Sequence, residues 1–172
     1  MEVDYLFKVG DKVVYPMHGA GIIEAIEEKE ILGEKRSYYI MHLPVGNIKV
    51  MVPMNNAEEV GIREIIDEQG ADRVIEILQD DGEVDLANWN HRYRANLDKM
   101  KSGDIFELAD VVRQLMLRDG GKGLSTGERK MLDNARQMLI SELALVKEMD
   151  EEQALSLLTN SVRRNVADTD NQ

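Results

Sequence analysis

The chain has 172 residues, an apolar fraction of 43%, no cysteine and a net charge of −12. This composition supports a packed core in one or two small domains and excludes disulfides and thiolate metal sites. The sequence shows neither a signal peptide at its start nor a run of 18 apolar residues, so we expect a cytoplasmic protein without a membrane span.

The charge is unevenly distributed along the chain. Residues 1–83 carry a net charge of −10, residues 84–136 carry +2, and residues 137–172 carry −4. Only the middle segment is able to attract phosphate, because DNA binding depends mainly on neutralisation of phosphates by cations. An acidic protein of this kind binds DNA weakly by itself. We therefore expect a partner to tether it, since tethering raises the effective concentration.

The first 56 residues have the pattern of a small antiparallel β domain. Glycine-containing turns recur at strand-length intervals, and the segments 22–26 and 38–43 are rich in β-branched and aromatic residues. In the strand that Pro53 ends, Lys49 and Met51 alternate with three inward-facing aliphatic residues that begin with Ile48. Four or five short strands predict an SH3-like barrel or half-barrel. An exposed edge strand there would accept a partner.

From residue 57 onward the apolar period becomes helical. The expected helical segments are a short turn at 57–60, helices at 63–67 and 71–78, helices that begin at Trp89 and Ile105, a long helix after the capping box Ser125-x-x-Glu128, and a last helix at 151–166. We therefore predict an α+β fold, with an SH3-like β domain at 1–56, a compact all-α domain at 57–167 and a polar tail at 168–172.

The sequence contains no recognisable catalytic or metal-binding constellation. The three histidines, His18, His42 and His91, are scattered, and no nucleophile elbow, phosphate loop or calcium loop occurs. Carboxylates are abundant, but nothing brings a nucleophile, a base and an orienting group together. We expect no enzymatic activity, no metal and no cofactor. An enzyme remains an alternative that a deep pocket with converging acid and base groups would support.

The block Asn88–Trp89–Asn90–His91–Arg92–Tyr93–Arg94 holds the only tryptophan of the chain. Two interpretations of Trp89 are open. The indole belongs to an apolar stripe with Tyr93 and Leu97, which is typical of a core residue. It also stands at the N-terminal end of that stripe, where an exposed ring would stack on a base or wedge into a groove.

Cations gather in the segment 88–102, whose only acid is Asp98. They are His91, Arg92, Arg94, Lys99 and Lys101. On a chain of net charge −12 this local excess of positive charge favours contact with phosphate. The alternative is that these cations only make the surface soluble.

A second group of candidates surrounds the helix start at Ser125. Free backbone N–H groups and the helix dipole at such a start attract phosphate, and the cations nearby are Lys122, Arg129 and Lys130. Ordinary capping explains Ser125 equally well, and Glu128 opposes an anion.

Several motifs together carry a family resemblance. They are Phe7–Lys8–Val9–Gly10–Asp11–Lys12–Val13–Val14–Tyr15–Pro16 with His18–Gly19, Val52–Pro53, Val60–Gly61–Ile62–Arg63, the block 88–94, Gly123–Leu124–Ser125 with Glu128–Arg129–Lys130–Met131–Leu132, and Glu142–Leu143–Ala144. From about Phe7 to Lys147 the chain resembles the CarD/CdnL family of bacterial transcription regulators. Its N-terminal part also resembles the polymerase-interacting domain of the transcription-repair coupling factor.

The resemblance implies a Tudor-like N-terminal domain that docks on the RNA polymerase β subunit, and a helical domain that meets promoter DNA at the upstream edge of the bubble. Trp89 matches the family tryptophan that wedges into the minor groove and hinders bubble collapse. Arg92 and Arg94 match positions on the DNA-facing helix. Lys29 and Met51 match basic positions that contact polymerase; Met51 is uncharged, so a hydrophobic or strand-edge contact would replace the ionic one.

Pattern and resemblance together predict a transcription regulator that stabilises the promoter open complex. Its partners would be the RNA polymerase β subunit, through Lys29, Lys49 and Met51, and promoter DNA. We expect a monomer that is associated with the nucleoid through polymerase. The alternative is an adaptor that binds polymerase without touching DNA, which the strong acidity and the exposed strand suggest.

Overall fold

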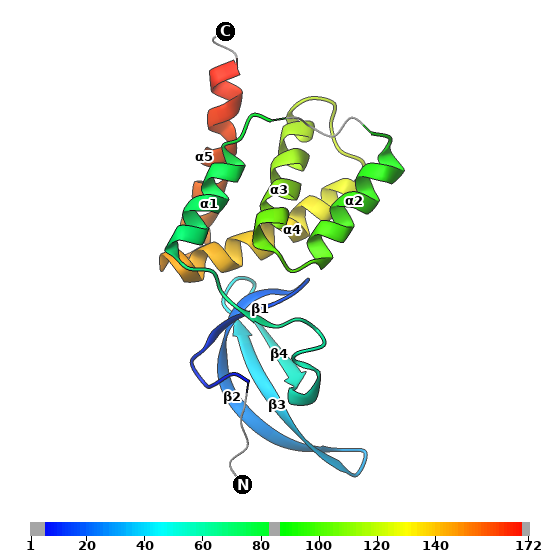
Figure 1. Cartoon of the computed structure of the whole chain (residues 1–172), viewed down its shortest axis with the longest axis vertical. Helices are drawn as coiled ribbons and strands as arrows, with labels where there is room; N and C mark the ends of the chain where they lie inside the picture. The colour runs from blue at the N-terminus through cyan, green and yellow to red at the C-terminus, as the bar shows by residue number, and fades with distance from the viewer. Residues whose placement is uncertain (1–5, 83–86, 170–172) are drawn as a thin grey trace.

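The computed structural model describes residues 6–82 and 87–169, and in the last helix the side chains up to Val162. A β part and a helical part are stacked along the long axis of the molecule (Figure 1). The predicted α+β fold, with a small antiparallel β domain before a helical one, is thus confirmed. None of the described helices combines the length and the apolar character that a membrane crossing requires.

The β part is a five-stranded antiparallel sheet with the order β4-β3-β2-β1-β5. The strands are β1 (Lys12–Tyr15), β2 (Gly19–Ile31), β3 (Glu34–Leu43), β4 (Ile48–Pro53) and β5 (Arg63–Glu64). The last strand returns to pair with the first, as an SH3-like half-barrel requires. The sheet core is formed by Phe7, Val13, Ile23, Tyr39, Met41, Leu43, Val52, Ala57 and Ile62.

The segment 63–67, predicted as a helix, was assigned wrongly. Arg63 and Glu64 form β5, which pairs with Val14 and Val13 of β1. The open edge of β1 and the burial of Ile62 in the sheet core override the local helical pattern. The segment 57–60 is a turn, preceded by a short 3₁₀ helix at Met54–Asn56.

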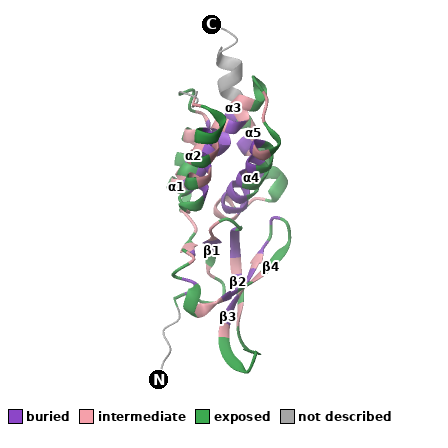
Figure 2. Ribbon diagram, turned by 90° about the vertical axis from the view of Figure 1, so that its right-hand side faces the viewer, coloured by how far each residue is buried: buried purple, intermediate pink, exposed green. Residues whose placement is uncertain are grey.

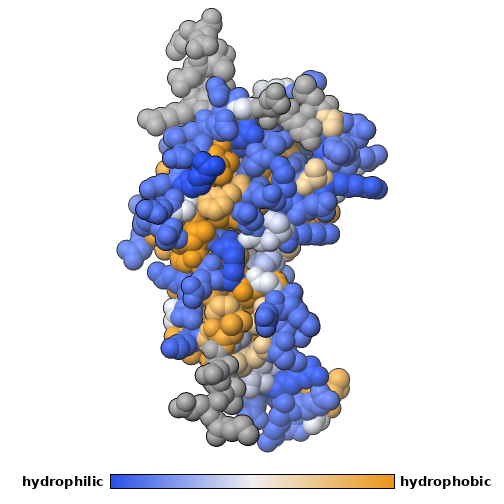
Figure 3. Space-filling model, viewed as in Figure 1, coloured by the Kyte–Doolittle hydropathy of each residue, from blue (hydrophilic) through white to orange (hydrophobic). Residues whose placement is uncertain are grey.

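The β2–β3 hairpin extends well beyond the body of the sheet, and its far end is exposed (Figure 2). Its two-residue turn is formed by Leu32 and Gly33, both with positive φ. Ile31 and Leu32 are exposed, and orange side chains stand at this end of the hairpin in Figure 3. In β4, Val52 is buried as expected, but Ile48 is exposed at the start of this edge strand.

The helical part contains α1 (Glu68–Leu78), α2 (Trp89–Lys101), α3 (Ile105–Gly120), α4 (Thr126–Lys147) and α5 (Glu151–Thr169). The predicted helices after residue 70 are thus confirmed. The last one continues past residue 166, so the predicted tail at 168–172 begins inside α5, and 170–172 lie outside the described residues. Apolar residues from all five helices share one core, which Val45 of the β3–β4 loop also enters.

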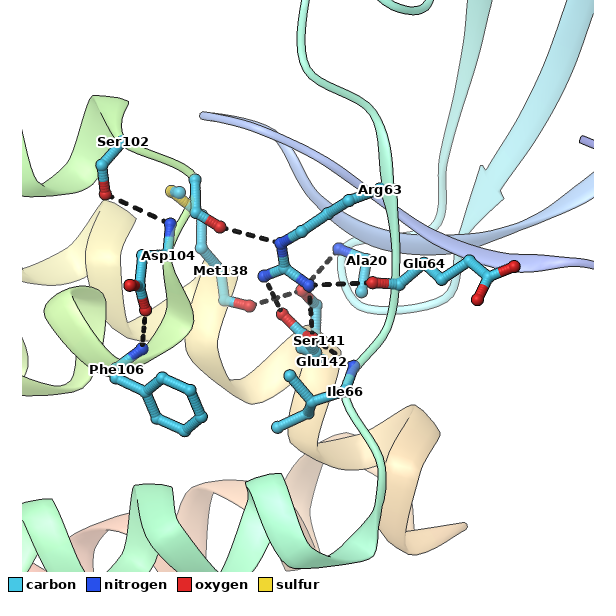
Figure 4. A network of polar contacts seen from close by, with 11 residues as sticks. Ala20, Arg63, Glu64, Ile66, Ser102, Asp104, Phe106, Met138, Ser141 and Glu142 are labelled. Atoms are coloured by element: carbon cyan, nitrogen blue, oxygen red, sulfur yellow. Dashed lines mark hydrogen bonds and ion pairs between the residues drawn. The ribbon is translucent and has the colours of Figure 1, made fainter. Parts of the chain in front are cut away.

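An ion pair between a buried glutamate and a partly exposed arginine joins the two parts (Figure 4). The carboxylate of Glu142 on α4 accepts hydrogen bonds from Nη1 and Nη2 of Arg63, at 2.8 and 2.7 Å, and from the backbone N–H of Ile66 at 2.9 Å. Arg63 also donates through Nε to the carbonyl oxygen of Gly103 at 2.8 Å. One guanidinium group therefore connects β5, α4 and the α2–α3 turn.

The neighbouring Ser141 makes a second link between α4 and the sheet. Its hydroxyl accepts a hydrogen bond from the backbone N–H of Ala20 at 2.8 Å and donates to the carbonyl oxygen of Met138 at 2.6 Å. Gly19 has φ 126°, and a Cβ there would come within 2.9 Å of the Ser141 hydroxyl oxygen. Only glycine permits this approach of strand to helix.

Candidate nucleic-acid interface

Trp89 is the first residue of α2, and 42% of its surface is exposed. Asn88 caps the helix by accepting a hydrogen bond from the backbone N–H of His91 at 3.0 Å. Burial increases along the apolar stripe, from the exposed indole through the half-buried Tyr93 to the buried Met100. The indole therefore lies at the outer end of the stripe, where a ligand has access to it.

The exposed indole packs on two helices. Its ring stacks on Tyr93, with 5.0 Å between centroids and 21° between planes. A Cβ at Gly127 would lie 3.6 Å from both Trp89 Cζ2 and Tyr93 Cε2, so the first turn of α4 underlies both rings. Nε1 of the indole donates a hydrogen bond to Oγ of Ser125 at 2.9 Å. The starts of α2 and α4 are thus joined.

Arg92 does not lie on the surface, contrary to the expectation for a phosphate contact. It is 9% exposed; its Nη1 donates to the carbonyl oxygen of Ala87 at 2.7 Å, and its Nη2 lies 3.5 Å from both carboxylate oxygens of Glu128. The reason is helical geometry, because Arg92, Asn96 and Met100 share the buried stripe of α2. Within this domain Arg92 holds α2 to α4.

Glu128 is buried, with 2% of its surface exposed. Besides Arg92, Nε of Arg118 lies 3.9 Å from its carboxylate. Two cations therefore compensate its charge inside the domain. From the sequence, Glu128 was expected to repel a phosphate at this helix start, but its carboxylate does not project from the surface. The predicted capping box is present in part, since Ser125 Oγ accepts from the Glu128 N–H at 3.2 Å.

The remaining cations of the candidate interface are exposed or partly exposed. His91, Arg94, Lys101, Lys122 and Lys130 form no ion pair with a carboxylate of the residues that the structure describes. Arg129 pairs with Asp119 at 2.8 Å, but both groups are accessible to solvent, so this ion pair is weak. Lys99 pairs with Asp110 at 2.7 Å.

The fold brings some of these cations near the indole and leaves others at a distance. Lys122, Arg129 and Lys130 flank Ser125 in sequence, and the Ser125–Trp89 bond places that segment beside the start of α2. Arg94 lies five residues after Trp89, about 1.4 turns along α2, and faces away from the buried side of that helix. Lys101 ends α2, about 18 Å farther along the axis, so it lies outside the immediate surroundings of the indole.

Asp110 on α3 fixes Lys99. Burial disfavours its charged form, but hydrogen bonds from Lys99 and Arg113, at 2.7 and 2.8 Å, outweigh burial and lower the pKa of the Asp110 carboxyl. Because the pKa is lower in the folded state, this carboxylate contributes stability above the ordinary pKa of Asp, and the contribution is lost as pH falls through the folded-state pKa.

Asp110→Asn is expected to lower the free energy of unfolding at pH 7 by about 1–3 kcal/mol, because Arg113 is buried and loses a charged acceptor. Urea unfolding at several pH values measures this. The difference between wild type and variant should shrink below about pH 4. A difference that stays constant down to pH 2.5 would contradict the assigned role of the carboxylate.

The candidate polymerase contacts lie on one face of the sheet. Lys29 pairs with Arg36, Met51 with Ile40, and Lys49 with His42. The three partners are separated by even numbers of residues along β3, so they lie on one face, and directly paired residues point to the same side of an antiparallel sheet. Lys29, Lys49 and Met51 therefore share the outer face, and Met51 is 42% exposed on the edge strand.

Two of the three histidines have local hydrogen-bond partners. His42 Nε2 lies 2.9 Å from Oδ1 of Asn47, and His18 Nδ1 lies 3.2 Å from the carbonyl oxygen of Pro16, so each has a local partner. Among the side chains that the structure describes, no three His, Asp or Glu residues gather in a way that could hold a metal ion.

Sequence reasoning missed the residues that support the indole. Tyr93 was recognised only as part of the apolar stripe, although its i+4 spacing from Trp89 permits stacking. Gly127 and Glu128 carry no signal that relates them to a tryptophan 38 or 39 residues earlier in the sequence. Their part in the site depends on the packing of α2 against α4.

Comparison with known proteins covers both parts of the chain. Residues 7–66 match the family model of the CarD-like/TRCF RID domain, and residues 73–159 match that of the CarD C-terminal domain. The chain belongs to the CarD family. This confirms the resemblance found in the sequence, and the two CarD-family models meet between β5 and the first turns of α1.

Two known proteins illustrate the similarity to other CarD-family members. "Putative transcription factor YdeB" from Bacillus subtilis (strain 168) is 47% identical over 152 residues, which is 88% of this chain and 99% of that protein. The solution NMR structure of the 72-residue N-terminal domain of Myxococcus xanthus CarD is 33% identical. It covers 37% of this chain and 84% of that chain, with a TM-score of 0.31.

Proposed function

We propose that this protein is a transcription regulator that binds RNA polymerase through the outer face of its sheet and stabilises the promoter open complex through its helical domain. Membership of the CarD family and the name of the Bacillus relative support a regulatory, non-enzymatic role. The match to the RID model supports a polymerase contact. The half-exposed indole of Trp89, with cations on the adjoining segments that pair with no carboxylate among the described residues, is the single observation that carries the DNA contact.

The proposed mechanism divides the work between the two domains. Polymerase holds the β domain, which localises an acidic protein that would bind DNA weakly by itself. Arg94, Lys122 and Lys130 then contact phosphates and fix the register on the duplex. The indole inserts at a base step that promoter melting has already distorted, which lowers the cost of unstacking. The open state is stabilised because the protein binds it better than the closed state.

The lifetime of promoter open complexes tests this function directly. Polymerase is mixed with promoter DNA, a competitor is added, and the decay of complexes is followed with and without the protein. A preference for the open state of about 1.4 kcal/mol would lengthen the lifetime roughly tenfold. Unchanged lifetimes at several promoters, at a protein concentration that saturates polymerase, would overturn the proposal.

Met51→Glu is expected to weaken binding to polymerase about tenfold or more, because a charge is placed in an apolar, strand-edge contact. Binding of labelled protein to purified polymerase, and to its isolated β subunit, measures the effect. Leu155→Glu is the matched control, since Leu155 on α5 is 40% exposed and lies in the other domain. Equal losses in both variants would contradict a contact at the outer face.

The β subunit as the docking partner, the nucleoid-associated location and the monomeric state stay predictions.

A further inference from the structure

The hydroxyl of Ser125 uses all of its hydrogen-bonding capacity within the domain. Oγ accepts from Trp89 Nε1 at 2.9 Å and from the backbone N–H of Glu128 at 3.2 Å. It also lies 3.3 Å from Oε1 of Glu128, to which it donates its proton. A serine hydroxyl has one proton and two lone pairs, so these three contacts saturate it. The hydroxyl is therefore already occupied before any phosphate arrives.

The Glu128 carboxylate, which accepts the hydrogen bond from Ser125, is itself held in place. The Glu128 carboxylate lies 3.5 Å from Nη2 of Arg92 and 3.9 Å from Nε of Arg118, and it is almost wholly buried. Arg92 in turn donates to the carbonyl oxygen of Ala87, just before α2. A continuous polar chain thus runs from the exposed indole through Ser125 and Glu128 to the segment that leads into α2.

The indole needs such a support. A tryptophan that is 42% exposed at the first position of a helix faces solvent on one side, so packing alone does not fix its two side-chain torsions. Stacking on Tyr93 fixes the plane of the ring, but sliding within that plane stays open. The bond from Nε1 to Ser125 fixes the direction of the ring within the plane, because the indole has a single N–H donor.

We infer that Ser125 is the positioning residue of Trp89: its hydroxyl holds the indole in one orientation before DNA is bound. This inference rests on the proposed function, in which Trp89 inserts at the bubble edge. A ring already held in its binding orientation loses less conformational freedom on insertion, so the complex is longer lived. Ser125 accordingly acts through Trp89 and not as a phosphate ligand.

The first measurement follows the motion of the indole in the free protein. Trp89 is the only tryptophan, so time-resolved fluorescence anisotropy reports on this ring alone. Ser125→Gly removes the hydroxyl at little loss of helix capping, because glycine is tolerated at an N-cap. We expect a larger amplitude of subnanosecond motion in Ser125→Gly and in Ser125→Ala, and wild-type motion in Ser125→Thr, which keeps the hydroxyl.

Asp67→Ala is the control for loss of a helix cap. Asp67 caps α1 by accepting from the Gly70 N–H at 2.8 Å, and α1 lies on the other side of the helical part from α2 (Figure 1). The Asp67→Ala variant should lower the melting temperature by as much as Ser125→Ala does and leave the indole motion unchanged. Unchanged motion in Ser125→Gly, or increased motion in Asp67→Ala, would overturn the positioning role.

The second measurement is the lifetime of promoter open complexes with each variant. We expect a lifetime about 2- to 10-fold shorter with Ser125→Gly than with wild type, the factor that one neutral hydrogen bond represents, and no change with Ser125→Thr. Increased indole motion with a wild-type lifetime would overturn the link between positioning and DNA contact. If the wild-type protein itself fails to lengthen the lifetime, the proposed function fails, while anisotropy still decides whether Ser125 orients the ring.

Discussion

Glu142→Ala is expected to lower the free energy of unfolding by about 3 kcal/mol and to separate the unfolding of the two domains. The substitution removes a buried carboxylate and leaves the partly exposed Arg63 guanidinium and the Ile66 N–H without their common acceptor, and loss of a charged acceptor of several hydrogen bonds is strongly destabilising. Urea unfolding followed by Trp89 fluorescence reports on the helical domain, and far-UV circular dichroism reports on both. The two transitions should coincide in the wild type and diverge in the variant.

Two further variants make this test specific. Glu142→Gln keeps the volume and part of the hydrogen bonding, so a smaller loss is expected. Asn134→Ala, at an exposed position on the same helix, should change stability by less than about 0.5 kcal/mol. Coincident transitions and a loss below about 1 kcal/mol in Glu142→Ala would show that the ion pair does not join the domains.

Trp89→Ala is expected to shorten the lifetime of promoter open complexes about tenfold relative to wild type, and to leave binding to polymerase unchanged. A tenfold change corresponds to about 1.4 kcal/mol, which is within the range of one base–aromatic contact. Competitor-challenge decay of preformed complexes measures the lifetime, and equilibrium binding of labelled protein measures the affinity for polymerase.

Leu155→Ala provides the matched control, because it also truncates a half-exposed apolar side chain of the helical domain. Its effect on the lifetime should be negligible. Equal lifetimes with Trp89→Ala and wild type would exclude the indole wedge and would favour the adaptor, which binds polymerase without touching DNA.

The sequence predicted the division of the chain into a β and a helical part because each part has a regular apolar period. Periodicity failed at Arg63–Glu64, where a two-residue strand forms only because β1 offers it an open edge. Such a strand has no local signal. Its position depends on a partner about 50 residues earlier in the chain, which a single sequence does not reveal.

The candidate site was predicted in its outline but not in its internal contacts. The indole is 42% exposed, which agrees with the second of the two interpretations that the sequence left open. Arg92 was expected to face DNA, but it is buried because the carboxylate of Glu128 compensates its charge. Glu128 lies on another helix, so the sequence of α2 gives no sign of this partner. Ser125 was recognised as a cap. Its bond to Trp89 requires the packing of α2 on α4, which residue spacing alone does not specify.

Photo-crosslinking from position 94 tests the central claim most directly. A photoreactive amino acid replaces Arg94, five residues after Trp89 on the exposed side of α2, and a second protein carries it at position 155 on α5 as a control. We expect crosslinks from position 94 to the upstream edge of the promoter bubble when polymerase is present, and none without polymerase. Position 155 should give none in either case. Absence of DNA crosslinks from position 94 in a complex that demonstrably contains the protein would contradict the account.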